Sequence, residues 1–400
     1  MKVLVVNDYA TPTGGAEIQL LLLRDELRKR GYDARFFASC ARSGKAESQA
    51  DYECFGTTSR FRTLLQTANP WAYWRLRKVL AEFQPDVVHI GVFLTQLSPL
   101  ILPLLRHTPS LYNVHWYRPI CPLGTKMFSD GSNCKTPAGT VCYRKRCLPL
   151  HDWIPLMLQM KFWRRWRHVF DVIVANSEAV KRRLVSEGIE PVEVIHNGVV
   201  TRPPRPSLSP PPTATFAGRL VREKGVDVLL RAFTKVVTSI PDARLFLAGE
   251  GPERENLQRM IAELGLLSNV TLLGHLSHID LERYFSAAWT QVVPSRWEEP
   301  FGVVATEAMM RGTAVVASNC GGLKEIVQHG RTGFLVPPDD ANALADALLK
   351  FMQDHDLAER MGEAGRRVAL TQFGVGIYVD RFVRLYQTLC SNRKDINVNC

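Results

Sequence analysis

The sequence predicts an α/β protein with two doubly wound, Rossmann-like domains that face a cleft. Apolar strand candidates alternate with amphipathic helix candidates, the alternation stops at a Pro-rich segment and then restarts, and 400 residues exceed what one ordinary core needs. Such alternation is typical of parallel sheets covered by helices on both faces. We expect domains at 1–200 and 214–372, a linker at 201–213 and a C-terminal helix within 373–400.

The first half opens with a strand, a glycine turn and a helix. KVLVVND, residues 2–8, is an apolar run, and residues 16–31 repeat apolar side chains at helical spacing up to the stop signal Gly31. The other strand candidates of this half are residues 33–39, 86–92, 110–116, 171–177 and 192–198.

The alternation restarts after RPPRPSLSPPPT, residues 202–213, whose composition is typical of a linker. The strand candidates are then 213–219, 243–249, 269–275, 290–295 and 314–318, with helix candidates at 226–237, 254–265, 281–288 and 302–312. Ligands of such sheets bind outside the carboxyl ends of the strands. The residues that follow predicted strands are Gly14, Gly15, His115, Asn197, Gly198, Gly218, Arg219, Gly249 to Pro252, Glu299, Gly321 and Gly322.

The composition, with 46% hydrophobic and 22% charged residues, is that of a soluble globular protein. We expect neither a signal peptide nor a membrane span, because the start turns polar after six residues and no run of 18 uncharged apolar residues follows. Of the net charge of +11, residues 1–200 carry most, with 27 Lys and Arg against 17 Asp and Glu. This excess predicts an anionic partner, such as a membrane surface, a phosphorylated acceptor or nucleic acid, or else a solvated basic face.

Two loops have features of phosphate binding. In FAGRLVREKG, residues 216–225, Arg219 and Lys224 flank a turn before a helix and could clamp a diphosphate; a merely solvated loop is the alternative. TPTGGAE, residues 11–17, lacks the three spaced glycines of dinucleotide sites, which disfavours a nicotinamide or flavin cofactor. Its glycine pair either admits a phosphate to the backbone amides or only forms a tight turn.

The segment EEPFGVVATE places Glu299 and Glu307 on either side of seven uncharged residues. Buried, unpaired carboxylates are rare, so an apolar context for Glu307 favours a ligand-binding role. A helix that starts at Gly302 would put its first amides between the two carboxylates. Acceptors and donors in this arrangement suit a polyhydroxylated ligand such as a sugar with a ribose. In the alternative, Glu299 is a carboxylate at the start of a helix and Glu307 is a surface residue, and neither binds a ligand.

Taken together, these motifs resemble those of a known enzyme family. GGAE, VHW near 115, NSE, HNGV, GRLVREKG, LAGEGP, EPFGVVATE and ASNCGGLKEIV resemble, in order and spacing, the retaining glycosyltransferases of the GT-B fold, family four, the group 1 glycosyl transferases. The resemblance covers nearly the whole chain. It implies transfer of a hexose from a UDP or GDP sugar to a hydroxyl of a glycan or lipid-linked acceptor, in cell-surface polysaccharide biosynthesis.

The resemblance also implies roles for the domains and for individual residues. The N-terminal domain would bind the acceptor, the C-terminal domain the nucleotide sugar, and the last helix would cross back to the N-terminal domain. Glu307 would hold the ribose and Glu299 the hexose, while Arg219 and Lys224 would hold the diphosphate. The other implied nucleotide-sugar contacts are Gly15, Asn197, Gly251, Leu276, Phe301, Gly302 and Val303.

His115 matches the catalytic-site histidine of the family, and Glu299 is the second implied catalytic residue. Many members have Asp after this histidine, where this sequence has Trp116. The implied chemistry is transfer with retention, in which the acceptor attacks from the face that the diphosphate leaves. Because two cations can replace a divalent ion, we expect metal-independent catalysis without a cofactor.

Four cysteines, Cys121, Cys134, Cys142 and Cys147, lie close together in the sequence. Their intervals of twelve, seven and four residues lack the two close cysteine pairs that are typical of zinc sites. The absence of an export signal disfavours disulfides. A structural zinc site and four reduced thiols both remain open.

Residues 152–170 interleave aromatic and basic side chains: Trp153, Phe162, Trp163 and Trp166 with Lys161, Arg164, Arg165 and Arg167. Residues 60–80 do so more mildly. This pattern predicts either an interfacial helix on anionic lipid or a helix whose aromatic side packs on the fold. We expect a cytoplasmic protein held peripherally at the inner face of the cell membrane.

Two other classes of function remain open. A sugar-nucleotide epimerase or a phosphorylase could use the same architecture. The charge could also belong to a basic membrane-binding or nucleic-acid-binding protein without transferase activity. The latter leaves the Glu pair and the glycine loops unexplained, so we expect no nucleic-acid partner.

Overall fold

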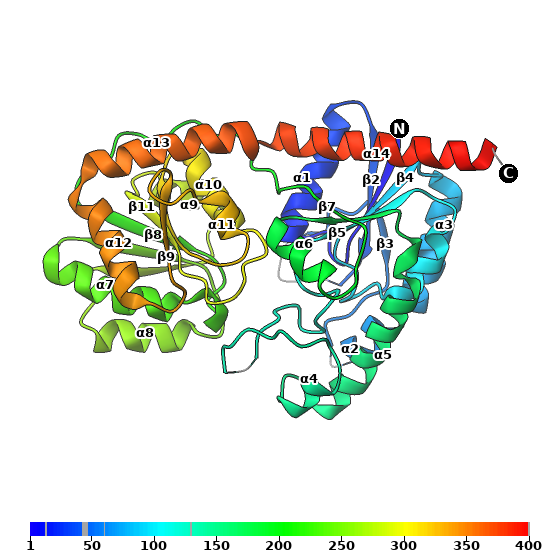
Figure 1. Cartoon of the computed structure of the whole chain (residues 1–400), viewed down its shortest axis with the longest axis horizontal. Coiled ribbons are helices and arrows are strands. Elements are labelled where there is room, and N and C mark those ends of the chain that lie inside the picture. Colours follow the sequence, from blue (N-terminus) through cyan, green and yellow to red (C-terminus); the bar gives the residue numbers. More distant parts are fainter. Residues whose placement is uncertain (13, 42–46, 60, 129, 399–400) are drawn as a thin grey trace. The chain divides into compact units, whose positions relative to one another are not determined.

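The computed structural model describes residues 1–12, 14–41, 47–59, 61–128 and 130–398 (Figure 1). They divide into two compact units. The first unit comprises Met1–Gly198 with Tyr378–Cys400, and the second comprises Val199–Ile377. Each unit contains one parallel sheet flanked by helices, which confirms the prediction of two doubly wound domains.

The sheet of the first unit has seven strands in the order β3-β2-β1-β4-β5-β6-β7. The strands are β1 (Lys2–Val6), β2 (Asp33–Ser39), β3 (Tyr52–Cys54), β4 (Val87–Ile90), β5 (Ser110–Val114), β6 (Val172–Ala175) and β7 (Val192–Val194). Val3 to Val6 of β1 are fully buried, because helices cover both faces of a parallel sheet.

The helices of this unit are α1 (Gly15–Lys29), α2 (Arg62–Thr67), α3 (Pro70–Phe83), α4 (Thr140–Arg144), α5 (Leu150–Trp166), α6 (Glu178–Val185) and, from Tyr378 onward, α14 (Val375–Val398). Two 3-10 turns lie at Pro99–Leu105 and Arg167–Val169. Tyr378, Phe382 and Tyr386 of α14 are buried within the unit, and the Tyr386 hydroxyl lies 2.6 Å from His89 Nδ1. The C-terminal helix is therefore an integral part of the first unit.

The second unit has a six-stranded sheet in the order β10-β9-β8-β11-β12-β13. The strands are β8 (Thr213–Ala217), β9 (Arg244–Ala248), β10 (Val270–Gly274), β11 (Thr290–Val293), β12 (Ala314–Ser318) and β13 (Gly333–Val336). The helices are α7 (Val226–Ser239), α8 (Arg254–Glu263), α9 (His278–Phe285), α10 (Val303–Arg311), α11 (Leu323–Ile326), α12 (Ala341–Gln353) and α13 (His355–Gln372), with a 3-10 turn at Arg222–Lys224.

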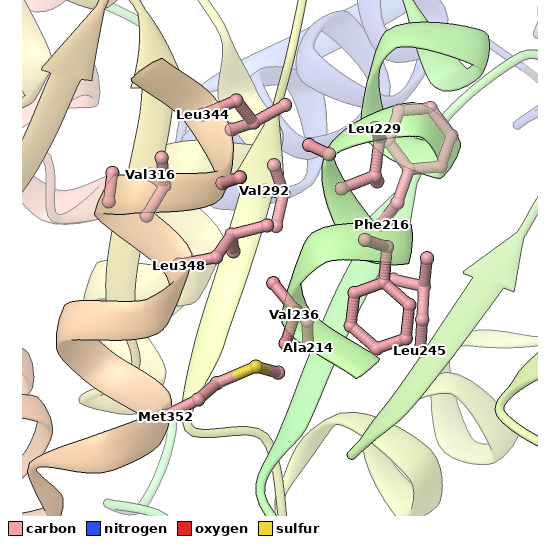
Figure 2. Close-up of a cluster of buried hydrophobic side chains, with 14 of the residues drawn as sticks. Ala214, Phe216, Leu229, Val236, Leu245, Val292, Val316, Leu344, Leu348 and Met352 are labelled. Carbon is pink, nitrogen blue, oxygen red and sulfur yellow. The ribbon is translucent and has the colours of Figure 1, made fainter. Parts of the chain in front are cut away.

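The main core of the second unit lies between its sheet and helices α7 and α12 (Figure 2). Leu344, Leu348 and Met352 recur at intervals of four along α12, so they share one face and point toward Val292 and Val316. This packing fixes the central strands, from whose carboxyl ends the candidate site is built. No helix in the described ranges is long and apolar enough to cross a bilayer.

Replacing Leu348 by Ala should lower the free energy of unfolding of the second unit by about 2–5 kcal/mol, because it leaves a cavity at a fully buried position. Leu370→Ala on α13, where the side chain is 40% exposed, is the matched control and should cost less than about 0.5 kcal/mol. Urea unfolding followed by circular dichroism measures both. Equal costs would show that Leu348 does not belong to the core.

Candidate functional site

The order of the second sheet reverses between β8 and β11. The strand after β8 lies on one side of this pair, and the strand after β11 lies on the other. Loops that leave such neighbouring strands diverge and open a crevice at their carboxyl ends, which is where open α/β sheets bind ligands. The loop after β8 carries Arg219 and Lys224, and the loop after β11 carries Glu299.

These two loops meet in a buried ion pair. The ammonium of Lys224 donates to both carboxylate oxygens of Glu299, at 2.9 and 2.8 Å. Ser295 Oγ and the indole Nε1 of Trp297 each donate to Glu299 Oε2 at 2.9 Å. Glu299 is 8% exposed, so its carboxylate is held in one orientation by donors from both loops.

The environment of Glu299 keeps its carboxylate ionised. Burial by itself raises the pKa, but the charge of Lys224 and the hydrogen bonds from Lys224, Ser295 and Trp297 together hold the pKa of Glu299 below its usual 4.5. The Lys224 ammonium also lies 5.5 Å from the centre of the Trp297 ring. Sequence reasoning missed Ser295 and Trp297, although both stand in the loop directly before Glu299.

The remaining charged candidates of the second unit are more open. The side chain of Arg219 is 67% exposed and makes one contact of 3.5 Å with Glu223. Glu307 is half-buried in α10, one turn beyond the helix start. Gly302 caps α10 in a left-handed conformation, with a φ of 107°, and Phe301 is buried beside it. The first amides of a helix have no partner within it, so this start can bind an anion or a hydroxyl oxygen.

Of the two remaining candidates in this unit, Gly251 has a packing explanation and Leu276 does not. A Cβ atom at Gly251 would lie 2.2 Å from the carbonyl oxygen of Leu220, so only glycine allows the two loops to approach. Leu276 is half-buried in the loop after β10. Contact of either residue with a nucleotide stays a prediction.

In the first unit, the corresponding reversal lies between β1 and β4. Gly15 begins α1 here, and a Cβ atom there would meet no other atom within 4 Å, so packing does not require a glycine. Burial raises the pKa of Glu17, two residues later, to about 7. Asp8 is buried and accepts hydrogen bonds from the amides of Thr95, Gln96 and Leu97, which assigns it a structural role.

His115 follows β5 at the same edge of this sheet. It is buried, and burial lowers its pKa to about 4, so the imidazole is neutral at physiological pH. Among the described residues, its Nε2 has no hydrogen-bond partner, and neither does Oδ1 of Asn197. Gln19 holds the backbone after Asn197 by exchanging hydrogen bonds with Gly198, at 2.9 and 3.2 Å. His115, Asn197 and Gly15 thus belong to the first unit, while all the other predicted contacts belong to the second.

Arg118, in the first unit, is a third residue that sequence reasoning missed. It is 5% exposed, and its Nη2 donates to Gln66 Oε1 and to the carbonyl of Leu94, at 2.7 and 3.1 Å. Burial lowers the pKa of Arg118 to about 10, and the charge of Asp8 opposes this shift. A single arginine in a loop carries no pattern that sequence reasoning could use.

The four cysteines of the loop after His115 are unbridged, as are all the cysteines that the structure describes. Cys134 and Cys142 are buried, and Cys121 and Cys147 are half-buried. Burial is the main cause that raises the pKa of the Cys147 thiol, and the charges of the other three thiols raise it further. Within the described part of the chain no group of three or more metal-ligating side chains is arranged to hold an ion, so the zinc site stays a prediction.

The aromatic residues of α5 do not form the exposed interfacial face predicted for them. Trp163 is fully buried and donates to the carbonyl of Pro119 at 2.9 Å. Trp153 is half-buried and donates to the carbonyl of Gly139, and the half-buried rings of Phe162 and Trp166 stack at 5.0 Å. The aromatic side of α5 instead packs on the fold, which is the alternative that the sequence left open. In the second predicted segment, Arg60 lies outside the described residues.

Two family models together match most of the chain. The family described as Glycosyltransferase Family 4 matches residues 13–203, and the one described as Glycosyl transferases group 1 matches residues 201–368. The chain is 30% identical over 185 residues to the alpha-D-kanosaminyltransferase of Streptomyces kanamyceticus, which covers 46% of this chain and 48% of that protein. The matched part therefore spans about half the length of this curated relative.

Solved structures match over the whole length. The sucrose-phosphate synthase of Thermosynechococcus elongatus is 23% identical with a TM-score of 0.76, covering 98% of this chain and 100% of that one. Anabaena HepE, in complex with UDP and glucose, is 21% identical with a TM-score of 0.70, covering 97% and 99%. At these identities the similarity shows the fold, which is GT-B.

Replacing Lys224 by Met should lower the free energy of unfolding by about 3–5 kcal/mol at pH 7, because Glu299 would be left buried without its counter-ion. Adding Glu299→Gln should restore part of this loss. Without Lys224, burial raises the pKa of Glu299, so the cost should shrink toward pH 5 as the carboxyl takes up a proton. Urea unfolding at both pH values tests this. Equal destabilisation of the single and double variants would refute the coupling.

Proposed function

The chain belongs to the group 1 glycosyl transferases and glycosyltransferase family 4, and we propose that it is a retaining hexosyltransferase. In this proposal the second unit binds a nucleotide diphosphate sugar, with a UDP or GDP sugar as donor. The first unit presents a hydroxyl of a glycan or lipid-linked acceptor. The product would enter cell-surface polysaccharide, and the enzyme would work in the cytoplasm at the inner face of the cell membrane.

The observation that carries the proposal is the Lys224–Glu299 pair at the switch point of the second sheet. A carboxylate fixed in an ionised state can accept hydrogen bonds from hexose hydroxyls. A neighbouring ammonium can neutralise a diphosphate oxygen. The half-buried Glu307 and the amides at the start of α10 offer further contacts to a ribose and a phosphate. HepE, of the same fold, is described in complex with UDP and glucose, which supports this class of donor.

The proposed step breaks the bond between the anomeric carbon and the diphosphate oxygen. The bonding electrons leave with the nucleoside diphosphate, whose added charge Arg219 and Lys224 stabilise. The acceptor oxygen forms the new bond on the face that the diphosphate leaves, and its proton passes to the departing phosphate oxygen. Two fixed cations can serve where other enzymes use a divalent ion, so we propose that the step needs no metal.

His115 would contact the sugar as a neutral imidazole in this mechanism. Its low pKa argues against a cationic role at physiological pH. The Nε2 atom, unpartnered among the described residues, could exchange a hydrogen bond with a hexose hydroxyl. The role proposed for His115 is therefore positioning and hydrogen bonding rather than supply of a charge.

The donor site is tested by thermal stability against UDP, GDP, ADP and dTDP. One of the four should raise the free energy of unfolding, by about 2.7 kcal/mol at a concentration one hundred times its dissociation constant. Glu307→Ala should remove the effect, while Glu363→Ala on α13, whose side chain is 71% exposed, should keep it. No shift with any nucleotide would contradict the proposal.

The chemistry is tested once the donor is known. His115→Gln should lower kcat roughly 100-fold, while stabilisation by the nucleotide stays unchanged. Proton NMR should show the anomeric configuration of the donor in the product, and chelators should leave the rate unchanged. An inverted product would contradict retention, and release of an isomerised sugar nucleotide would indicate an epimerase.

A further inference from the structure

The solvent-exposed side of α5 changes character along the helix. Leu150, Ile154 and Leu158 recur at intervals of four and are 50%, 57% and 43% exposed. Beyond them, the exposed positions are basic, at Lys161, Arg164 and Arg165. The fully buried Trp163 anchors another side of α5 to the first unit, while this aliphatic stripe stays about half exposed to solvent.

Helices α2 and α3 of the same unit also expose large apolar side chains. Phe61 and Leu64 at α2 are 58% and 61% exposed, and Trp71 and Trp74 on α3 are 54% and 60% exposed. The ring of Phe55, itself 47% exposed, lies 5.2 Å from that of Trp71. Tryptophan is rarely so exposed in a soluble domain unless that surface binds something.

Direct contacts join these helices. Thr63 Oγ1 donates to Asp152 Oδ1, and Thr67 Oγ1 donates to the carbonyl of Pro155, both at 2.8 Å. Helix α2 therefore lies along the first half of α5, and the chain passes from α2 into α3 within two residues. We call the exposed apolar side chains of these helices the α2–α3–α5 surface: Phe61, Leu64, Trp71, Trp74, Leu150, Ile154 and Leu158.

The charge around this surface is predominantly positive. Residues 61–83 and 150–168 together hold eight Lys and Arg, against Asp152 and Glu82 as acids. Arg77 lies 5.5 Å from the centre of the Trp74 ring, and its side chain stays exposed. Glu82 lies 3.6 Å from Lys78, and Asp152 lies 3.6 Å from His151. Eight cations against these two acids leave an excess of six positive charges on the two segments.

We propose that the α2–α3–α5 surface docks the first unit on an anionic lipid bilayer. Aliphatic and tryptophan side chains enter the headgroup boundary, while the Lys and Arg side chains reach lipid phosphates. Aliphatic residues and tryptophans rimmed mainly by cations suit this partner, because a bilayer supplies apolar depth and negative charge together. The inference rests on the proposed function, in which this unit takes a lipid-linked acceptor.

The test is flotation of the full chain with vesicles of phosphatidylcholine alone or mixed equally with phosphatidylglycerol. Binding should require phosphatidylglycerol and weaken as salt is raised. Two double variants, Trp71→Ser with Trp74→Ser and Ile154→Ser with Leu158→Ser, should each weaken binding by roughly tenfold or more. Lys161→Gln with Arg165→Gln should also weaken it by roughly tenfold or more, because each cation near an anionic surface contributes to binding.

The matched control is Leu267→Ser with Ile279→Ser in the second unit, where the side chains are 73% and 85% exposed. It removes comparable exposed apolar side chains and should leave vesicle binding unchanged. Stabilisation by the donor nucleotide should persist in every variant. This readout separates failure of the docking surface from failure of the donor site or of folding.

Three outcomes would overturn the inference. Equal binding to both kinds of vesicle would exclude recognition of anionic lipid. Equal loss of vesicle binding in the control variant would show that exposed apolar side chains promote binding wherever they lie on the protein. Light scattering that shows a dimer, converted to a monomer by the tryptophan variants without any vesicle binding, would assign the surface to a second copy of the chain.

Discussion

A parallel sheet that is buried on both faces leaves polar side chains few places except the ends of its strands. Both units obey this constraint. The central strands are rich in buried apolar residues, although they also hold buried polar ones such as Asn113 and Gln291. Glu299, Lys224 and His115 follow β11, β8 and β5 at the carboxyl edge. The location of chemistry in this protein therefore follows from how its hydrophobic cores are built.

Burial has opposite consequences for the two predicted catalytic residues. Glu299 is buried with a cation and two neutral donors, so it remains a carboxylate. His115 is buried without a compensating charge, so it remains neutral. Removal of both groups from water keeps each in a single protonation state near neutral pH.

Much of the fold could be predicted from the sequence, because the alternation of strands and helices is strong in both halves. The predicted strands at 33–39, 213–219 and 314–318 coincide with β2, β8 and β12, whereas the short β3 and β13 carried too few residues for a pattern. Lys224 and Glu299 were both assigned to the donor site, but their direct ion pair was not predicted, because 75 residues separate them and only the strand order brings their loops together. The sequence left open whether the aromatic residues of α5 face lipid or pack on the fold, since sequence spacing alone does not tell which face of a helix is covered.

The indole of Trp297 stands inside the candidate donor site, with its nitrogen bonded to Glu299 and its ring beside the Lys224 ammonium. The emission of an indole depends on the charges around it and on its hydrogen bonds. A ligand that draws Lys224 away changes the charge beside the ring, and one that draws Glu299 away breaks the hydrogen bond of the indole. The residue that orients the carboxylate is thus also a native optical reporter, whose share of the emission of the eight tryptophans is the part that a Trp297→Phe variant loses.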